Sequence, residues 1–159
     1  MKRALVTYFS ASGTTKKVAQ TLADATDGDL FEIAAKTPYS SADLNWHNRG
    51  SRSSVEMNNP EARPQVAAAC DTADYDVIFV GYPIWWYTAP RIIQTFVEQT
   101  DLEGKTVVTF CTSGSSDIGD STDDLARTAP RGITWVKGQR FTPKTSKRQL
   151  ELWSEQYLR

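Results

Sequence analysis

Residues 3–15 read RALVTYFSASGTT, and this stretch decides the fold class. Its first seven residues are mostly apolar and rich in β-branched and aromatic side chains, which is typical of a strand. The next six are small and carry four hydroxyls, and from Lys16 to Ala25 the apolar Val18 and Leu22 recur at helical i,i+4 spacing. The stretch therefore predicts a strand, a tight loop and a helix in direct succession.

The same alternation continues along the chain. Further strands are predicted over Leu30–Ala34, Val77–Tyr82, Thr106–Cys111 and Ile133–Val136, and further helices from Pro90 onward, over Ser121–Ala129 and over Ser146–Leu158. Ser121 and Asp124 also have the spacing of a capping box at the start of their helix. Five strands separated by helices predict an α/β fold with a parallel sheet, helices on both faces and right-handed crossovers.

Length and charge exclude several classes of protein. The chain has 159 residues, which predicts a single domain over residues 1–159. Eighteen basic and nineteen acidic residues leave a formal net charge of −1. This balance argues against nucleic acid or an anionic membrane surface as a partner, because both attract an excess of basic residues. Neither a signal peptide nor a membrane-spanning run is recognised, so we expect a cytoplasmic protein without membrane insertion.

Catalytic side chains are scarce in this sequence. Cys70 and Cys111 stand far apart, and His47 is the only histidine. A thioredoxin-type site or a His/Cys metal cage is therefore excluded, and a catalytic triad would depend on His47. The Cys-x5-Arg motif of small phosphatases and the GxSxG motif of serine hydrolases are both absent. We expect no metal site and no catalytic side chain, which favours a bound cofactor as the source of chemistry.

Three loops are unusual among those that follow the predicted strands, where open parallel sheets bind ligands. Residues 10–15 (SASGTT) place hydroxyls and N–H groups at a helix N-terminus, as phosphate sites do, without the lysine of a nucleoside triphosphate loop. Residues 82–90 (YPIWWYTAP) carry adjacent tryptophans that suit a flat heterocycle, and residues 112–119 (TSGSSDIG) supply hydroxyls and glycines. Each loop alone also fits helix capping, core packing or a plain connection. Together they predict a slot with a phosphate pocket beside an aromatic wall.

One segment interrupts the alternation. Ala35 to Asp76 is longer than a crossover with its helix requires. Its part from Lys36 to Pro64 is rich in Ser, Asn and Pro and contains scattered aromatic and basic residues, namely Tyr39, Trp46, Arg49 and Arg52. Such an excursion is either a surface loop or a wall of a binding site. Its aromatic content and its place beside the strand ends favour the wall.

The three loops together resemble those of the flavodoxin-like FMN proteins. SASGTT after the first strand is similar to the family's phosphate loop, [ST]-x-[ST]-G-x-T, and GYPIWW and FCTSGSSDIG follow the third and fourth strands in the family's order. The likeness runs from Lys2 to about Gly119, and DLNWHNRGSRSSVEMNNPEARP resembles the long second crossover of a bacterial branch. This resemblance implies a flavodoxin-like three-layer sandwich with a five-stranded sheet in the order 2-1-3-4-5.

The resemblance also implies FMN as the cofactor and carries over its binding residues. The FMN phosphate would be held by Ser10, Ser12, Gly13, Thr14 and Thr15. The isoalloxazine ring would be lined by Pro83, Ile84, Trp85 and Trp86. Its other side would be closed by Thr112, Ser113, Gly114, Ser115 and Gly119.

The implied function is electron transfer through the flavin, and the partner stays open. The protein could be an NAD(P)H-dependent reductase of quinone-like acceptors, which the near-neutral charge and the aromatic excursion favour. It could instead be an electron carrier that docks with another redox protein, which the short chain without a second nucleotide site favours. A non-catalytic module that binds another phosphorylated ligand is the alternative of a different class. We expect a monomer or a homodimer.

Overall fold

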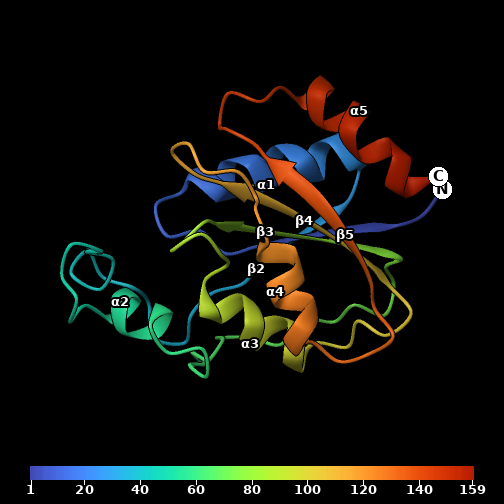
Figure 1. Ribbon diagram of the computed structural model, residues 1–159. Coiled ribbons are helices and arrows are strands. Elements are labelled where there is room, and N and C mark those ends of the chain that lie inside the picture. Colours follow the sequence, from blue (N-terminus) through green and yellow to red (C-terminus); the bar gives the residue numbers. More distant parts are fainter.

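The sheet consists of five parallel strands, and the computed structural model describes all residues from 1 to 159 (Figure 1). The strands are β1 (Ala4–Tyr8), β2 (Asp29–Glu32), β3 (Val77–Pro83), β4 (Thr106–Thr112) and β5 (Thr134–Arg140). Their order is β2-β1-β3-β4-β5, and every neighbouring pair is parallel. The predicted fold class and strand order are thus confirmed. The order reverses between β1 and β3, where sheets of this kind bind ligands.

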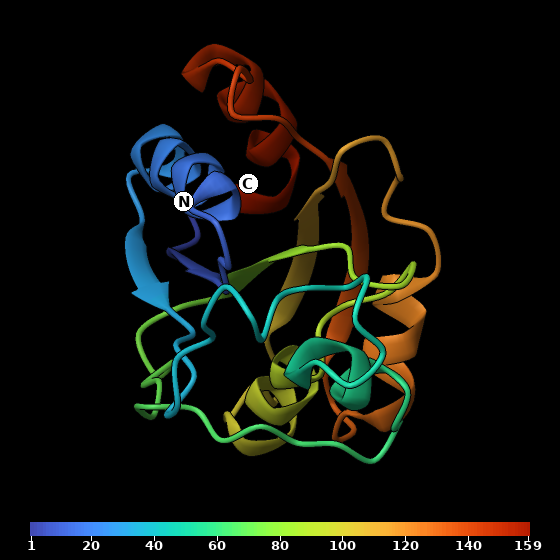
Figure 2. The same cartoon turned by 90° about the vertical axis from the view of Figure 1, so that its left-hand side faces the viewer.

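Helices cover both faces of the sheet. In Figure 1, α1 (Thr14–Thr26) and α5 (Lys147–Leu158) lie above the sheet, whereas α3 (Arg91–Gln99) and α4 (Ser121–Thr128) lie below it. A fifth helix, α2 (Arg52–Met57), lies in the long excursion. No helix combines the length and the apolar character needed to cross a bilayer. In this three-layer arrangement, the loops that follow the strands lie at one edge of the sheet. That edge faces the viewer in Figure 2.

The central strand β3 explains why both faces need a cover. Ile78 and Val80 belong to the core cluster on the α3 side, and Val77 and Phe79 belong to the cluster on the α1 and α5 side. All four side chains are fully buried. Because successive residues of a strand point to opposite faces, an uninterrupted apolar strand requires a helix layer on each side. Gly81 ends this run, since a Cβ there would lie 2.1 Å from the ring of Phe110.

Some predicted boundaries are wrong. β5 runs on to Arg140 instead of ending at Val136, because it is an edge strand that can expose polar side chains on one face. The capping box at α4 does not form, since the cap residue is Asp120 and makes no side-chain cap. The hydroxyl of Ser121 instead bonds the Ile118 carbonyl and lies 2.7 Å from the Tyr82 hydroxyl. Burial of Ser121 therefore overrides the local capping pattern.

The excursion is tied to the body of the fold at several points. Ala35 and Val66 form an antiparallel bridge, so the segment leaves and returns along neighbouring paths. Arg91 at the start of α3 donates to the carbonyls of Glu56 and Met57, which fastens the last turn of α2. Figure 2 shows the excursion, in teal and green, in front of the strand ends and of α3. The excursion thus forms an ordered wall at the edge where ligands bind.

Candidate functional site

The three predicted loops meet at one residue, Thr112, the last residue of β4. Its hydroxyl lies 2.7 Å from the Thr15 hydroxyl at the start of α1, and its carbonyl accepts a 3.0 Å hydrogen bond from the Ile84 amide after β3. The side chains of Thr15 and Thr112 are both buried. The first, second and third predicted loops are therefore held together by direct hydrogen bonds.

The loop between β1 and α1 has an open, polar tip. Gly13 adopts φ of +91°, and no atom lies within 4 Å of where its Cβ would be. Its amide donates to the Ser10 hydroxyl over 3.0 Å, and the hydroxyls of Ser12 and Thr14 lie 3.3 Å apart at the surface. Among the residues predicted to hold a phosphate, Thr15 alone is buried, and its hydroxyl is bonded to that of Thr112. Ser10, Ser12, Gly13 and Thr14 surround the open tip.

The N-terminus of α1 offers unused hydrogen-bond donors. No side chain caps the helix, and its first turn contains no acidic residue. The amides of Thr14, Thr15 and Lys16 donate to no other group of the protein, whereas the Lys17 amide bonds the Gly13 carbonyl. Free amides and the partial positive charge of a helix N-terminus stabilise an anion. This geometry suits the phosphate of FMN.

The loop between β3 and α3 contains a strained two-residue turn. Trp85 and Thr88 exchange backbone hydrogen bonds of 2.9 and 3.1 Å, and the residues between them, Trp86 and Tyr87, have φ of +49° and +66°. This hairpin turn normally uses Asn and Gly, because side chains disfavour positive φ. The turn leaves Trp86 41% and Tyr87 84% exposed. Strain that presents two aromatic rings to solvent is typical of a binding loop.

Trp85, which precedes this turn, is part of an aromatic cluster. Its ring packs edge-on against Phe9 and Tyr39, with centroids 5.7 and 5.6 Å away. The Tyr39 hydroxyl donates to Glu56 over 2.5 Å, and the Arg52 guanidinium lies 3.8 Å from the centre of the Tyr39 ring. Burial, helped by the hydrogen bond to Glu56, raises the pKa of Tyr39 above its ordinary value, so the hydroxyl stays a donor. The cluster joins the excursion to the β3 loop.

The loop between β4 and α4 is braced by a residue that the sequence did not point to. Arg140 at the end of β5 donates to the Ser113 hydroxyl and to the carbonyls of Ser113 and Gly114. At the other end of the loop, Gly119 has φ of +52°, and its amide donates to Asp117 over 2.8 Å. The predicted β5 ends at Val136, four residues before Arg140. Only a longer predicted strand would have placed Arg140 beside this loop. The brace holds the hydroxyl-rich loop in a defined shape.

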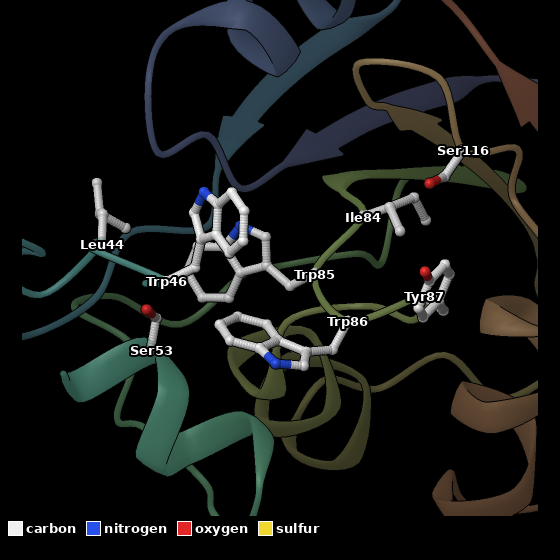
Figure 3. Close-up of a pocket in the computed structure, with 8 residues that line it drawn as sticks. All are labelled: Leu44, Trp46, Ser53, Ile84, Trp85, Trp86, Tyr87 and Ser116. Carbon is white, nitrogen blue, oxygen red and sulfur yellow. The ribbon is translucent and has the colours of Figure 1, made fainter. Parts of the chain in front are cut away.

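A cavity of about 440 Å³ lies between the excursion and the β3 and β4 loops. Figure 3 shows the residues that line it, which are Leu44, Trp46, Ser53, Ile84, Trp85, Trp86, Tyr87 and Ser116. Ile84, Trp85 and Trp86 were predicted to line a flavin ring, and they do line this cavity. The remaining predicted ring residues do not line this cavity, and they are Pro83, Thr112, Ser113, Gly114, Ser115 and Gly119.

The sequence did not identify the cavity residues of the excursion. Leu44, Trp46 and Ser53 form its far wall, and of these the sequence singles out only Trp46, as an aromatic residue in a polar segment. Trp46 is 65% exposed and stacks on His47, with ring centroids 3.8 Å apart. The predicted role of the excursion as a wall of the site is supported by this arrangement.

Reactive side chains are not gathered at the site. Cys111 is fully buried in β4, and burial raises the pKa of its thiol to about 12. No group of three His, Cys, Asp or Glu side chains anywhere in the chain could hold a metal ion. What the site offers is an anion-binding helix end, an aromatic cavity and hydroxyls, which is the chemistry of binding a phosphorylated aromatic molecule.

Comparisons with known proteins agree with this geometry. The family model described as flavodoxin matches residues 3–157. A crystal structure of a candidate flavoprotein from Bacteroides eggerthii DSM 20697 is 48% identical over 98% of this chain and 97% of that chain, with a TM-score of 0.91. A candidate flavoprotein from Bacteroides uniformis ATCC 8492 is 44% identical over 97% and 98%, with a TM-score of 0.90.

A more distant structure shares the fold. The flavoprotein from Lactobacillus acidophilus NCFM, crystallised in complex with FMN, is 22% identical over 97% of this chain and 99% of that chain, with a TM-score of 0.73. The comparison with curated proteins gives no match.

Proposed function

This chain belongs to the flavodoxin family, and from that premise we propose that it is an FMN-binding flavoprotein that transfers electrons through the flavin. FMN would supply the redox chemistry, because its ring accepts and releases electrons singly or as a hydride. The protein would supply binding, orientation and a controlled approach to the ring. The Lactobacillus acidophilus relative in complex with FMN supports this choice of cofactor.

The single observation that carries the proposal is the pairing of an uncapped helix end with an aromatic cavity. The amides of Thr14, Thr15 and Lys16 are free to donate, and the hydroxyls of Ser12 and Thr14 lie beside them. These groups would hold the phosphate, which is a hydrogen-bond acceptor on every oxygen. Trp86 belongs to the aromatic side of the site and would face the ring. Because Thr112 links both parts, one ligand with a phosphate and a flat ring satisfies the whole arrangement.

We further propose that the partner of the flavin is a small molecule, which makes the protein a reductase. The excursion places Leu44, Trp46 and Ser53 opposite Trp86, so the cavity has two walls. A net charge of −1 would also give little electrostatic steering toward a charged protein partner. The electron-carrier alternative has one observation in its favour, because Tyr87 is 84% exposed and could contact a docked protein.

Binding of two flavins to the apoprotein tests the cofactor assignment. Replacing Ser12 and Thr14 by Ala should weaken FMN by about 10- to 150-fold for each hydroxyl that bonds the charged phosphate, and should leave riboflavin unchanged. The matched control is Thr21→Ala, which removes a hydroxyl from the exposed side of α1 that bonds only the Lys17 carbonyl. Quenching of flavin fluorescence measures both affinities. An equal loss for FMN and riboflavin would show that the phosphate binds elsewhere.

Rapid mixing separates the reductase from the carrier. The FMN-loaded protein is mixed with NADH or NADPH without oxygen, and the flavin absorbance is followed. Bleaching within seconds supports the reductase. Absorbance that stays constant over minutes with both nucleotides would refute it and leave the carrier.

A further inference from the structure

Ser53 in the first turn of α2 has a hydroxyl with almost no partner inside the protein. The residue is 2% exposed, and its amide donates to the Asp43 carbonyl over 3.0 Å. The hydroxyl reaches only the Ser51 oxygen, at 3.5 Å. That distance is well beyond the usual 2.5–3.0 Å between hydroxyl oxygens. The Ser53 hydroxyl therefore remains available for another hydrogen bond.

The neighbouring serines do not compete for this hydroxyl. Ser51 donates its own proton to the Ser54 hydroxyl over 2.9 Å and accepts from the Ser54 amide over 3.3 Å. Ser54 in turn donates to the Asn48 carbonyl over 2.9 Å. Each serine hydroxyl has a single proton to donate, and those of Ser51 and Ser54 are used within the turn. Only the Ser53 proton lacks an acceptor at normal distance.

Ser53 faces the 440 Å³ cavity, whose lining is otherwise almost entirely apolar. Figure 3 shows Ser53 near Trp46 and Trp86, whereas the other two hydroxyl-bearing residues of the lining, Ser116 and Tyr87, lie on the opposite side. No charged side chain lines the cavity. An ionised group would lose part of its hydration there without gaining a counter-charge, which is unfavourable. The cavity therefore selects an uncharged ligand that accepts a hydrogen bond on the α2 side.

Two indoles define the shape of that ligand. Trp46 is 65% and Trp86 41% exposed, so both leave aromatic surface uncovered around the cavity. Trp46 is not loosely placed, because His47 stacks on it at 3.8 Å and the surrounding turns are closed by hydrogen bonds. Examples are the Gly50 amide with the Asn48 side chain and the Ser53 amide with Asp43. A wall that is already ordered and aromatic suits a flat aromatic ring.

We propose that the α2 side of the cavity is a binding site for flat, uncharged aromatic carbonyl compounds, the chemical class of quinones. Ser53 donates to the carbonyl oxygen, and Trp46 packs against the ring. The proposal rests on the proposed function, since it names the acceptor that such a flavoprotein would use. It assigns specificity to the excursion and leaves the phosphate loop to the cofactor.

Binding to the oxidised FMN-loaded protein, without any nicotinamide, tests this site. The probe is 2-methyl-1,4-naphthoquinone, and 2-methylnaphthalene is the matched ligand that lacks both carbonyl oxygens. Isothermal titration calorimetry measures both affinities. Loss of one neutral hydrogen bond in Ser53→Ala should weaken the quinone by about 2- to 13-fold and leave the hydrocarbon unchanged. Ser53→Thr, which keeps a hydroxyl, should retain more of the quinone affinity than Ser53→Ala.

Further variants locate the ligand in the cavity. Trp46→Leu should weaken the quinone and the hydrocarbon alike, and because Trp46 is 65% exposed this variant should fold normally. Ser116→Ala removes the serine hydroxyl on the opposite side, and Tyr87→Phe removes the phenol hydroxyl there; both variants should leave the two affinities unchanged. Quinone affinity that depends on Ser116 and not on Ser53 would overturn the assignment.

The FMN affinity of every variant separates this proposal from the proposed function. A wild-type protein that takes up FMN but does not bind the quinone overturns the acceptor site and leaves the FMN assignment intact. If Ser53→Ala weakens FMN itself, Ser53 belongs to the cofactor site and the proposal is wrong. A protein that takes up no FMN refutes both.

Discussion

The strained turn at Trp86 and Tyr87 leads to a stability prediction in which glycine is favoured over alanine. Tyr87 has φ of +66° and is 84% exposed, so its side chain contributes little packing while its backbone is strained. We compare two replacements, Tyr87→Ala and Tyr87→Gly, which lose the same exposed ring. They differ chiefly in whether a Cβ is present in a left-handed conformation. We expect the glycine variant to be the more stable of the two.

The expected difference follows from two opposing effects. A Cβ in the left-handed region costs about 1–2 kcal/mol, and glycine avoids this cost. Glycine loses more conformational entropy on folding, which costs about 0.5–1 kcal/mol relative to alanine. The net preference for glycine is therefore about 0.7 kcal/mol, which corresponds to about 1.5–3 °C in the melting temperature of a domain of this size.

Urea unfolding of both variants, followed by circular dichroism, measures the difference. The control is the same pair of replacements at Gln20, an exposed position within α1, where alanine should be more stable than glycine by about 0.8–1 kcal/mol. Opposite signs at the two positions support the strain. An alanine variant at 87 that matches or exceeds the glycine variant would refute it.

Three further predictions concern other parts of the site. Gly13→Ala should destabilise the protein by about 0.7 kcal/mol in thermal unfolding, because φ of +91° is strained for alanine, although its Cβ would meet nothing, and the smaller entropy loss of alanine offsets part of that strain. Arg140→Met should weaken FMN and riboflavin equally in a fluorescence titration, because it frees the Ser113 and Gly114 carbonyls of the loop predicted beside the ring and leaves the phosphate loop untouched. Cys111 should resist iodoacetamide at pH 8 until the protein is unfolded, because its thiol is buried. Burial raises the pKa of this thiol from 9.0 to about 12, so its contribution to stability should be complete below pH 9 and should be lost as the pH rises from 9 toward 12.

Each of these has an outcome that would contradict it. Unchanged stability of Gly13→Ala would mean that the loop adapts at no cost. A selective loss of FMN over riboflavin in Arg140→Met would place the brace at the phosphate instead of the ring. Mass spectrometry that finds Cys111 alkylated in the native protein at pH 8 would contradict its burial, and Cys111→Val should remove its share of the alkaline loss of stability.

The sheet could be predicted because its signals are local. The apolar run of β3 and the small, polar loop after β1 can each be recognised from their own residues. The strand order followed from the resemblance of three loops to those of a known family. β5 was predicted too short because Lys137, Gly138 and Gln139 look like a loop in sequence, whereas an edge strand tolerates polar residues on its open side.

The far wall of the site could not be predicted because its residues act through distant contacts. Ser53 is one serine among several in a polar segment, and only folding brings it to the cavity and leaves its hydroxyl without a close partner. α2 is six residues long, which is too short for a helical period to stand out. The one local feature that marks α2 is its N-cap, where the Ser51 side chain accepts a hydrogen bond from the Ser54 amide.

The position of Thr112 has a thermodynamic consequence. Its side chain bonds Thr15 in the loop between β1 and α1, and its backbone bonds Ile84 beside the cavity, so a shift of either region would strain a hydrogen bond that ties it to the other. Coupling of this kind is reciprocal, so a ligand in one region changes affinity in the other by the same factor in both directions. Inorganic phosphate should therefore change the affinity for riboflavin by the same factor as riboflavin changes the affinity for phosphate. Thr112→Val, which keeps the shape and removes the hydroxyl, should reduce that cooperativity.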